Sequence, residues 1–138
     1  MTEYEDKKAA FRMRTKQYAV MTIRLFCALP RTRDEVRVLG KQLLRSGTSV
    51  AANYREASRA RSDAEFVSKV DLCAQEADES MLWLELLKEE CHISSEPLDW
   101  LLKESDELIA IFVTMSKKFK RGRVDVFQLS AFTPHPFL

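Results

Sequence analysis

Glu89 and His92 form the one Glu-x-x-His pair in the sequence, a spacing that places a carboxylate and an imidazole on one face of a helix. Carboxylate-bridged metal pairs in helical proteins need two such pairs and two further glutamates. The chain has only one other histidine, His135, so the count fails. The sequence also contains no Gly-rich phosphate loop, nucleophile elbow or Cys/His dyad. We therefore expect no enzymatic activity, no catalytic residue, no metal site and no cofactor.

The three cysteines, Cys27, Cys73 and Cys91, are each flanked by apolar, helix-like sequence and show no C-x-x-C spacing. An odd number of cysteines in such settings indicates reduced, buried thiols rather than a disulfide framework or a zinc site. Residues 1–11 contain no apolar signal segment, and no apolar run reaches the length of a membrane span. We therefore expect a cytoplasmic protein with no membrane partner.

The 138 residues are 46% hydrophobic and 31% charged, and they include only 3 Gly and 4 Pro. This length suits a single domain, and this composition excludes collagen-like, disordered and transmembrane classes. The scarcity of helix-breaking residues favours helices. The formal net charge of +1 shows no overall bias toward a partner of either sign, so any electrostatic inference depends on where the charges lie.

Apolar residues recur at helical spacing in four segments that are separated by short connections. The segments span about residues 8–29, 33–60, 63–91 and 96–121. Connections of a few residues bring consecutive helices together in antiparallel pairs. The pattern therefore predicts an all-α fold, an up-down-up-down antiparallel four-helix bundle over residues 1–121 whose last helix ends in basic residues.

Local signals mark the helix starts. The first helix is expected to begin about Lys8. Residues 32–35 and 62–65 have the form of capping boxes, in which a hydroxyl and a carboxylate three residues later satisfy free backbone amides. Ser95 offers a cap hydroxyl to the last helix, ahead of an early proline.

Residues 122–138 break the helical period and contain two prolines, so we predict an irregular C-terminal tail. Its Phe127, Phe132 and Phe137 repeat every five residues, which fits neither a helix face nor one face of a strand. Two interpretations stay open: a loosely packed terminus, or an arm that docks on a neighbouring subunit.

Two features of the second and third segments exceed what a generic bundle needs. Residues 46–52 concentrate small side chains around Gly47, although glycine costs about 1 kcal/mol against alanine in a helix. Small side chains allow close approach, either to a helix of the same bundle or at a subunit interface. A polar stripe on the second segment faces acidic residues of the third; these residues are Arg45, Ser49, Asn53, Glu56, Glu76 and Glu79. They form either a solvated surface or a partly buried hydrogen-bond network.

The stretch from Leu39 to Leu87 resembles the bacterial four-helix bundle proteins first known from open reading frames in intervening sequences of 23S ribosomal RNA genes. The family pattern has an Arg-Ser pair, a Ser-Val step, an Asn followed three residues later by Glu, a basic turn and an acid-rich third helix. Here these are Arg45-Ser46, Ser49-Val50, Asn53 with Glu56, Arg59 to Arg61, and Glu76 with Glu79. Many members read Asn-Ile-Ala-Glu-Gly where this chain reads Asn-Tyr-Arg-Glu-Ala, which indicates a distinct branch.

The resemblance implies a homo-oligomer, commonly a pentamer, with no known catalytic activity. A related member, the accessory variability determinant protein of diversity-generating retroelements, is a pentamer that binds nucleic acid through basic surfaces and associates with a reverse transcriptase. The resemblance thus implies fold and assembly, and it leaves the partner of this chain open.

Charge is segregated along the chain. Residues 7–61 contain 14 Lys/Arg and 3 Asp/Glu, whereas residues 63–107 contain 3 and 14. The predicted topology brings the start of the first helix and the ends of the second and fourth helices to one end of the bundle. The cations expected there are Lys7, Lys8, Arg12, Arg14, Lys16, Arg55, Arg59, Arg61, Lys117, Lys118, Lys120, Arg121 and Arg123.

Cations at helix C-termini complement the helix dipole, but this does not account for those at the start of the first helix. A concentrated positive field favours phosphate binding through counterion release. We therefore predict a non-enzymatic, homo-oligomeric accessory protein that binds RNA or DNA, or serves as a scaffold, through this basic end. The alternative is a protein-protein adaptor that binds another protein and no nucleic acid.

Overall fold

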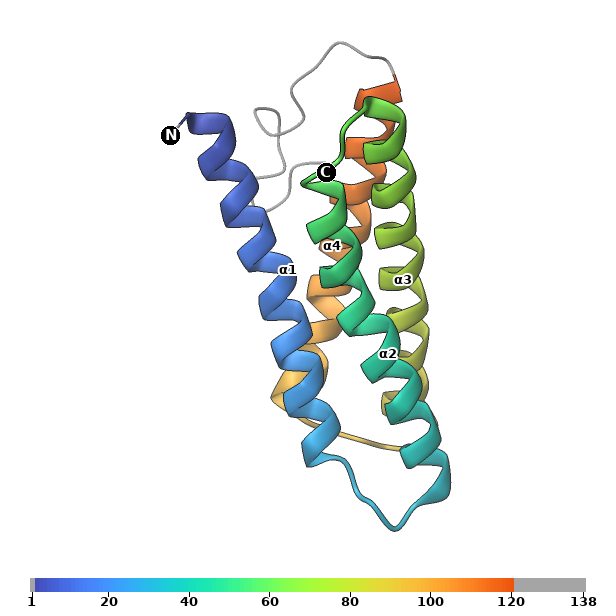
Figure 1. Cartoon of the computed structure of the whole chain (residues 1–138). Helices are drawn as coiled ribbons and strands as arrows, with labels where there is room; N and C mark the ends of the chain where they lie inside the picture. The colour runs from blue at the N-terminus through green and yellow to red at the C-terminus, as the bar shows by residue number, and fades with distance from the viewer. Residues whose placement is uncertain (1, 121–138) are drawn as a thin grey trace.

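The computed structural model describes residues 2–120, which form four helices and no strand (Figure 1). They are α1 (Glu3–Ala28), α2 (Asp34–Ala57), α3 (Asp63–Glu89) and α4 (Glu96–Lys120). The predicted all-α class is confirmed. The tail with Phe127, Phe132 and Phe137, as well as Arg121 and Arg123, lies outside the described residues. None of the helices within residues 2–120 combines the length and the apolar character that crossing a membrane requires.

The helices run up, down, up and down, so that the start of α1 and the end of α4 lie at the same end of the bundle (Figure 1). Each helix packs on the next one in the chain, and α1 closes the arrangement against α4. The diagonal pairs, α1 with α3 and α2 with α4, are separated by the core, across which Tyr54 of α2 and Phe112 of α4 lie with ring centroids 6.2 Å apart. The four-helix bundle predicted from the apolar spacing is therefore confirmed.

The helix starts show how local signals and tertiary contacts compete. α1 begins at Glu3, five residues earlier than expected, because Thr2 Oγ1 accepts a hydrogen bond from the backbone of Glu5 at 3.1 Å and three acids occupy the first turn. The capping box predicted at residues 32–35 is wrong. Arg33 occupies the cap position of α2, makes no side-chain cap bond and instead donates to the carbonyl of Cys91 at 2.8 Å.

The other two predicted caps are present. Ser62 Oγ accepts a hydrogen bond from the backbone of Glu65 at 3.1 Å, while the Glu65 carboxylate accepts one from the backbone of Arg61. Ser95 Oγ accepts one from the backbone of Leu98 at 3.3 Å. Each of these bonds satisfies an amide that has no partner inside the helix, and so fixes where α3 and α4 begin.

The core is a continuous column of side chains that point inward from all four helices. At the end where α1 begins, Phe11, Tyr54 and Phe112 are fully buried, and Phe11 meets both of the other rings edge to face, with ring centroids 4.7 Å apart for Phe11 and Tyr54. Aromatic pairs in this geometry add to the stabilisation from burial itself. Halfway along, the Tyr18 hydroxyl lies 2.6 Å from Ser105 Oγ, which links α1 to α4 inside the core.

The small-residue segment of α2 packs inside the bundle at two positions. Ser46 Oγ lies 2.6 Å from Ser80 Oγ of α3. A Cβ atom at Gly47 would lie 2.6 Å from Thr22 Oγ1 of α1, far inside normal contact distance. Gly47 is therefore the position that lets α1 and α2 approach closely.

Candidate nucleic-acid interface

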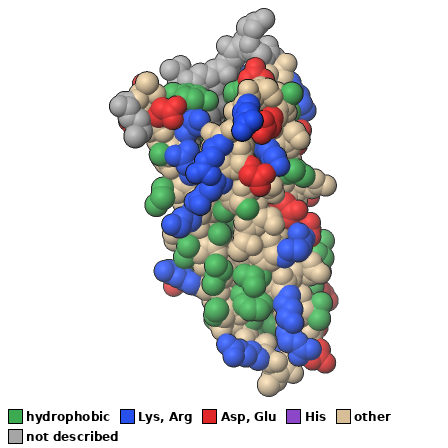
Figure 2. All heavy atoms as spheres, in the orientation of Figure 1, with side chains coloured by type: hydrophobic (Ala, Val, Ile, Leu, Met, Phe, Trp, Pro, Cys, Tyr) green, Lys and Arg blue, Asp and Glu red, His purple; other side chains and the backbone are tan. Residues whose placement is uncertain are grey.

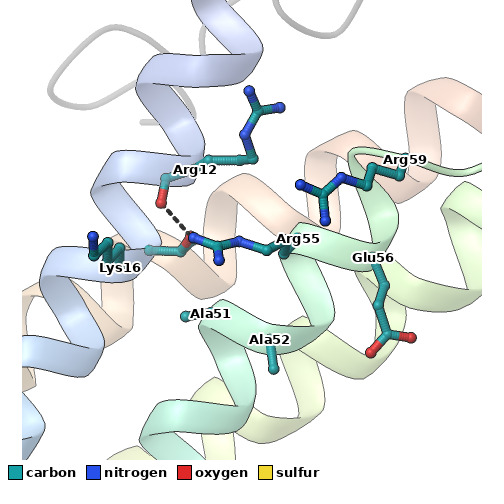
Figure 3. A pocket seen from close by; sticks show the side chains of 8 residues that line it. Arg12, Lys16, Ala51, Ala52, Arg55, Glu56 and Arg59 are labelled. Atoms are coloured by element: carbon teal, nitrogen blue, oxygen red, sulfur yellow. Dashed lines mark hydrogen bonds between the residues drawn. The ribbon is translucent and has the colours of Figure 1, made fainter.

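A groove of about 480 Å³ lies between α1 and α2 and is lined mainly by basic and small residues (Figure 3). Arg12 and Lys16 come from α1, Arg55 comes from the last turn of α2, and Arg59 lies in the turn that follows α2. Arg12 and Lys16 are spaced by four residues, which brings their side chains to the same face of α1, one turn apart. The groove therefore presents two short rows of cations, one on each wall.

Small residues of α2 form the floor of the groove. Ala51 and Ala52 line it one turn before Arg55, where longer side chains would fill the space. In Figure 3 the Arg55 side chain extends from α2 toward α1, and the Arg59 side chain extends in the same direction from the turn after α2. Thr15 Oγ1 donates to the carbonyl of Arg12 at 3.0 Å, so this hydroxyl is used within α1.

The four cations of the groove form no ion pair within the part of the chain that the structure describes. The one carboxylate among the lining residues is Glu56, which points away from α1 in Figure 3 and pairs with Lys69 Nζ of α3 at 2.7 Å. The hydrogen bond to Glu56 raises the pKa of Lys69. Because Glu56 is already paired, the positive charge of the groove is not neutralised by the protein itself.

Figure 2 shows Lys and Arg side chains gathered over the upper part of the face that α1 and α2 form. Not all of the cations expected at this end lie there. Arg14 turns to the opposite side of α1, where its guanidinium binds Glu104 of α4 through two bonds of 2.8 and 2.9 Å and Glu107 through a third of 3.1 Å. The hydrogen bond with Glu104 raises the pKa of Arg14 further. Arg14 therefore holds α1 to α4.

The remaining predicted cations are spread over the end of the bundle. Lys8 and Arg61 line a second cavity of about 190 Å³ there, together with Asp63. Lys7 pairs with Glu3 at 3.0 Å, and Lys120 pairs with Asp71 at 3.7 Å. Two further lysines, Lys117 and Lys118, stand in the last turn of α4. The structure thus brings together four of the predicted residues, Arg12, Lys16, Arg55 and Arg59, in one groove.

The polar stripe of α2 divides into two separate contacts with α3. Arg45 donates to Glu76 at 3.3 Å and also binds Glu79, and half of the Arg45 side chain is exposed. Glu56 pairs with Lys69 instead, a partner that the sequence pattern had not indicated. Of the other two members, Ser49 Oγ donates to the carbonyl of Arg45 at 2.7 Å and Asn53 is half-buried. The charged members of the stripe therefore form partly exposed ion pairs between α2 and α3, whereas Ser49 bonds within α2.

The groups considered for metal or thiol chemistry are scattered. Glu89 ends α3, whereas His92 lies beyond it with a left-handed φ of 58°, so the two do not share a helix face. No group of three or more candidate metal ligands occurs among residues 2–120. Cys73 and Cys91 are buried as expected, and burial raises the pKa of Cys73, but the expectation is wrong for Cys27, which is exposed at the end of α1.

The sequence did not predict Thr15, Ala51 and Ala52 as site residues, although their short side chains line the groove and leave it open. A signal was present in the sequence. One pair of cations spaced by four residues lies on the first helix, and a second pair lies at the end of the second helix, directly after a pair of alanines. The rotation of each helix about its axis, which separates Arg14 from Arg12, follows only from the assembled core.

Comparison with known proteins identifies a family and similar solved structures. The model of the 23S rRNA-intervening sequence protein family matches residues 7–114. One of these structures is that of a protein with unknown function, from the S23 ribosomal protein family, from Bacteroides thetaiotaomicron VPI-5482. It is 33% identical, with a TM-score of 0.71, and the match covers 80% of this chain and 98% of that one. No curated protein matches the chain. Since the family match spans all four helices, the chain belongs to the 23S rRNA-intervening sequence protein family.

Proposed function

We propose that this protein is a non-enzymatic accessory protein of the cytoplasm that self-associates and binds the phosphate backbone of nucleic acid through the groove between α1 and α2. One observation carries the proposal: Arg12, Lys16, Arg55 and Arg59 line a single groove and form no ion pair within the described residues. Unneutralised cations on facing walls attract a polyanion and release its condensed counterions on binding.

The groove suits a phosphate backbone better than a base edge. Its floor is alanine, and its walls carry guanidinium and ammonium groups, which bind phosphate oxygens without reading sequence. Self-association increases the effect, because each added copy contributes another groove to the same strand and raises the effective concentration of the next contact. We therefore expect binding that depends strongly on salt and weakly on sequence.

The experiment is a fluorescence anisotropy titration of the protein into labelled single-stranded RNA and labelled duplex DNA, at low and at physiological salt. The test variant is Arg55→Glu/Arg59→Glu. The matched control is Arg31→Glu/Lys41→Glu, which makes the same change in charge at two exposed positions outside the groove. Circular dichroism and size-exclusion chromatography establish that each variant keeps its fold and its assembly state.

We expect wild type and the control variant to bind with similar affinity, and the groove variant to bind about tenfold more weakly or worse at low salt. Equal losses for both variants would mean that only the overall charge matters, and would refute the groove as the site. No binding by wild type at low salt would refute nucleic-acid binding altogether and favour the protein-protein adaptor.

A further inference from the structure

A second cavity continues the groove toward the end of the bundle where α1 begins and α4 ends (Figure 1). Lys8 lines this cavity and stands four residues before Arg12, which lines the groove, so the two side chains share one face of α1. Arg61 lines the cavity as well, and it follows the groove residue Arg59 by two positions. The positive charge of the groove therefore extends into the cavity.

The cavity is small. Its volume is about 190 Å³, whereas pockets that enclose a whole drug-sized ligand measure about 300–1,000 Å³. The groove, with about 480 Å³, is more than twice as large. This difference in size suits a strand whose backbone follows the groove while one planar side group enters the cavity.

An aromatic ring of α4 forms part of the cavity wall. Phe119 is half-buried, so part of its ring stays accessible from the cavity. The buried Phe66 of α3 packs on Phe119, with ring centroids 4.3 Å apart and ring planes inclined by 33°, and this contact fixes the orientation of the Phe119 ring. A held aromatic ring beside cations is the platform on which proteins stack the bases of single-stranded nucleic acids.

The cavity differs from the groove in that it also offers a carboxylate without a partner. Asp63, the first residue of α3, lines it and forms no ion pair within residues 2–120. A carboxylate repels phosphate, but it accepts hydrogen bonds from the amino groups that cytosine, adenine and guanine carry. Its presence beside Lys8 and Arg61 therefore favours the polar edge of a base over a further phosphate.

We propose that this cavity holds one unstacked base of a single-stranded nucleic acid, with the base on Phe119, its amino group on Asp63, and the phosphates of the strand in the groove between α1 and α2. The inference rests on the proposed function, and it adds the class of nucleic acid that the site prefers. The bases of a duplex are already stacked and paired, so a duplex binds through its phosphates alone, whereas a single strand gains the contact with Phe119.

The first test compares two labelled DNA strands of equal length by fluorescence anisotropy with the full-length protein. One strand is oligodeoxycytidine, and the other carries the same phosphates with an abasic spacer at every position. We expect the intact strand to bind about fivefold more tightly or better, because it alone supplies a base to stack. Equal, salt-dependent binding of both strands would overturn the base site and leave the proposed function standing. No binding of either strand or of a duplex at low salt would overturn both.

The second test removes the ring. Phe119→Leu should weaken binding of the intact strand about fivefold or more and leave binding of the abasic strand unchanged, while Phe119→Tyr keeps a ring and should bind as wild type does. Trp100→Leu, at an exposed aromatic residue of α4 outside the cavity, is the matched control. A loss by Phe119→Leu that is equal on both strands, or no loss on either, would overturn the proposal. Circular dichroism establishes that each variant is folded; if Phe119→Leu is not, the comparison of the two strands on wild type decides.

The third test concerns the carboxylate. Thymine has no amino group, so wild type should bind oligodeoxycytidine about threefold more tightly than oligodeoxythymidine. Asp63→Ala should abolish this preference, although it raises the affinity for both strands by removing a negative charge. Asp34→Ala, at the first residue of α2, is the matched control and should keep the preference. Equal binding of the two strands by wild type, or a preference that Asp63→Ala retains, would overturn the contact of the base with Asp63.

Discussion

Gly47→Ala should destabilise the protein although alanine is the better helix former. The new methyl group would lie 2.6 Å from Thr22 Oγ1 and 2.8 Å from Thr22 Cγ2. Thr22 is fully buried, and its hydroxyl donates to the carbonyl of Tyr18 at 2.9 Å, so this β-branched side chain has little freedom to move away. α1 and α2 must then separate.

The magnitude follows from two opposing effects. Overpacking of a filled core costs about 1–3 kcal/mol. Replacing glycine by alanine inside a helix stabilises the helix by about 1 kcal/mol. Since two atoms of Thr22 are too close, we place the overpacking cost in the upper part of its range. The free energy of unfolding should fall by about 1–2 kcal/mol.

The assay is urea unfolding followed by circular dichroism at a fixed protein concentration. Gly40→Ala is the matched control, because there the close atom is Leu29 Cδ1, at the end of a flexible side chain that can shift. We expect a smaller loss for this control. In the double variant Thr22→Ala/Gly47→Ala the space for the methyl group is restored, and the loss caused by Gly47→Ala should largely disappear.

Two results would refute this reasoning. If Gly47→Ala raised the free energy of unfolding by about 1 kcal/mol, Gly47 would behave as an open helix position and α1 would not lie against it. If the losses for Gly47→Ala and Thr22→Ala simply added in the double variant, the two residues would not be in contact.

The further predictions concern three side chains, Tyr54, Tyr18 and Glu56. In urea unfolding, Tyr54→Phe should leave the free energy of unfolding unchanged or raise it by up to about 1 kcal/mol, because the buried Tyr54 hydroxyl has no hydrogen-bond partner in the described structure. Tyr18→Phe should lower the free energy of unfolding by about 1 kcal/mol, because it removes the bond to Ser105. Burial raises the pKa of Tyr18 to about 12. The stability that its neutral form contributes is therefore complete below the unfolded-state pKa near 10 and should be lost between about pH 10 and pH 12. A wild-type free energy of unfolding that stays constant between these pH values would contradict this. Glu56→Ala should change stability by less than about 0.5 kcal/mol in thermal unfolding, because its side chain is 56% exposed and its bond to Lys69 is a surface ion pair, and a loss above about 1 kcal/mol would contradict this.

The fold was predictable because its determinants are local. The apolar period identifies each helix, and the short connections leave an antiparallel bundle as the arrangement that buries all four apolar faces. The start of α1 was misplaced because the apolar period that identifies this helix begins only at Phe11, whereas the helix itself begins at the Thr2 cap and the three acids after it. The cap expected at residues 32–35 failed because Arg33 binds the carbonyl of Cys91, which is 58 residues away and invisible to a local pattern.

The candidate site was predictable only in part. The sequence places the cations at the correct end of the bundle, but it does not show how far each helix is rotated about its axis. That rotation directs Arg14 to Glu104, 90 residues later, and leaves Arg12 in the groove. The same limit applies to Glu56, whose partner Lys69 became apparent only once α2 and α3 were placed side by side.

The central claim is that Arg55 and Arg59 contact nucleic-acid phosphates, and the salt dependence of binding tests it most directly. The dissociation constant for duplex DNA is measured over a series of salt concentrations for wild type and for Arg55→Gln/Arg59→Gln. Each phosphate contact contributes a slope of about 0.9 to the plot of log affinity against log salt. We predict that the slope of the variant is smaller than that of wild type by about 1.8. An unchanged slope would contradict the claim, because neither arginine would then be replacing a counterion.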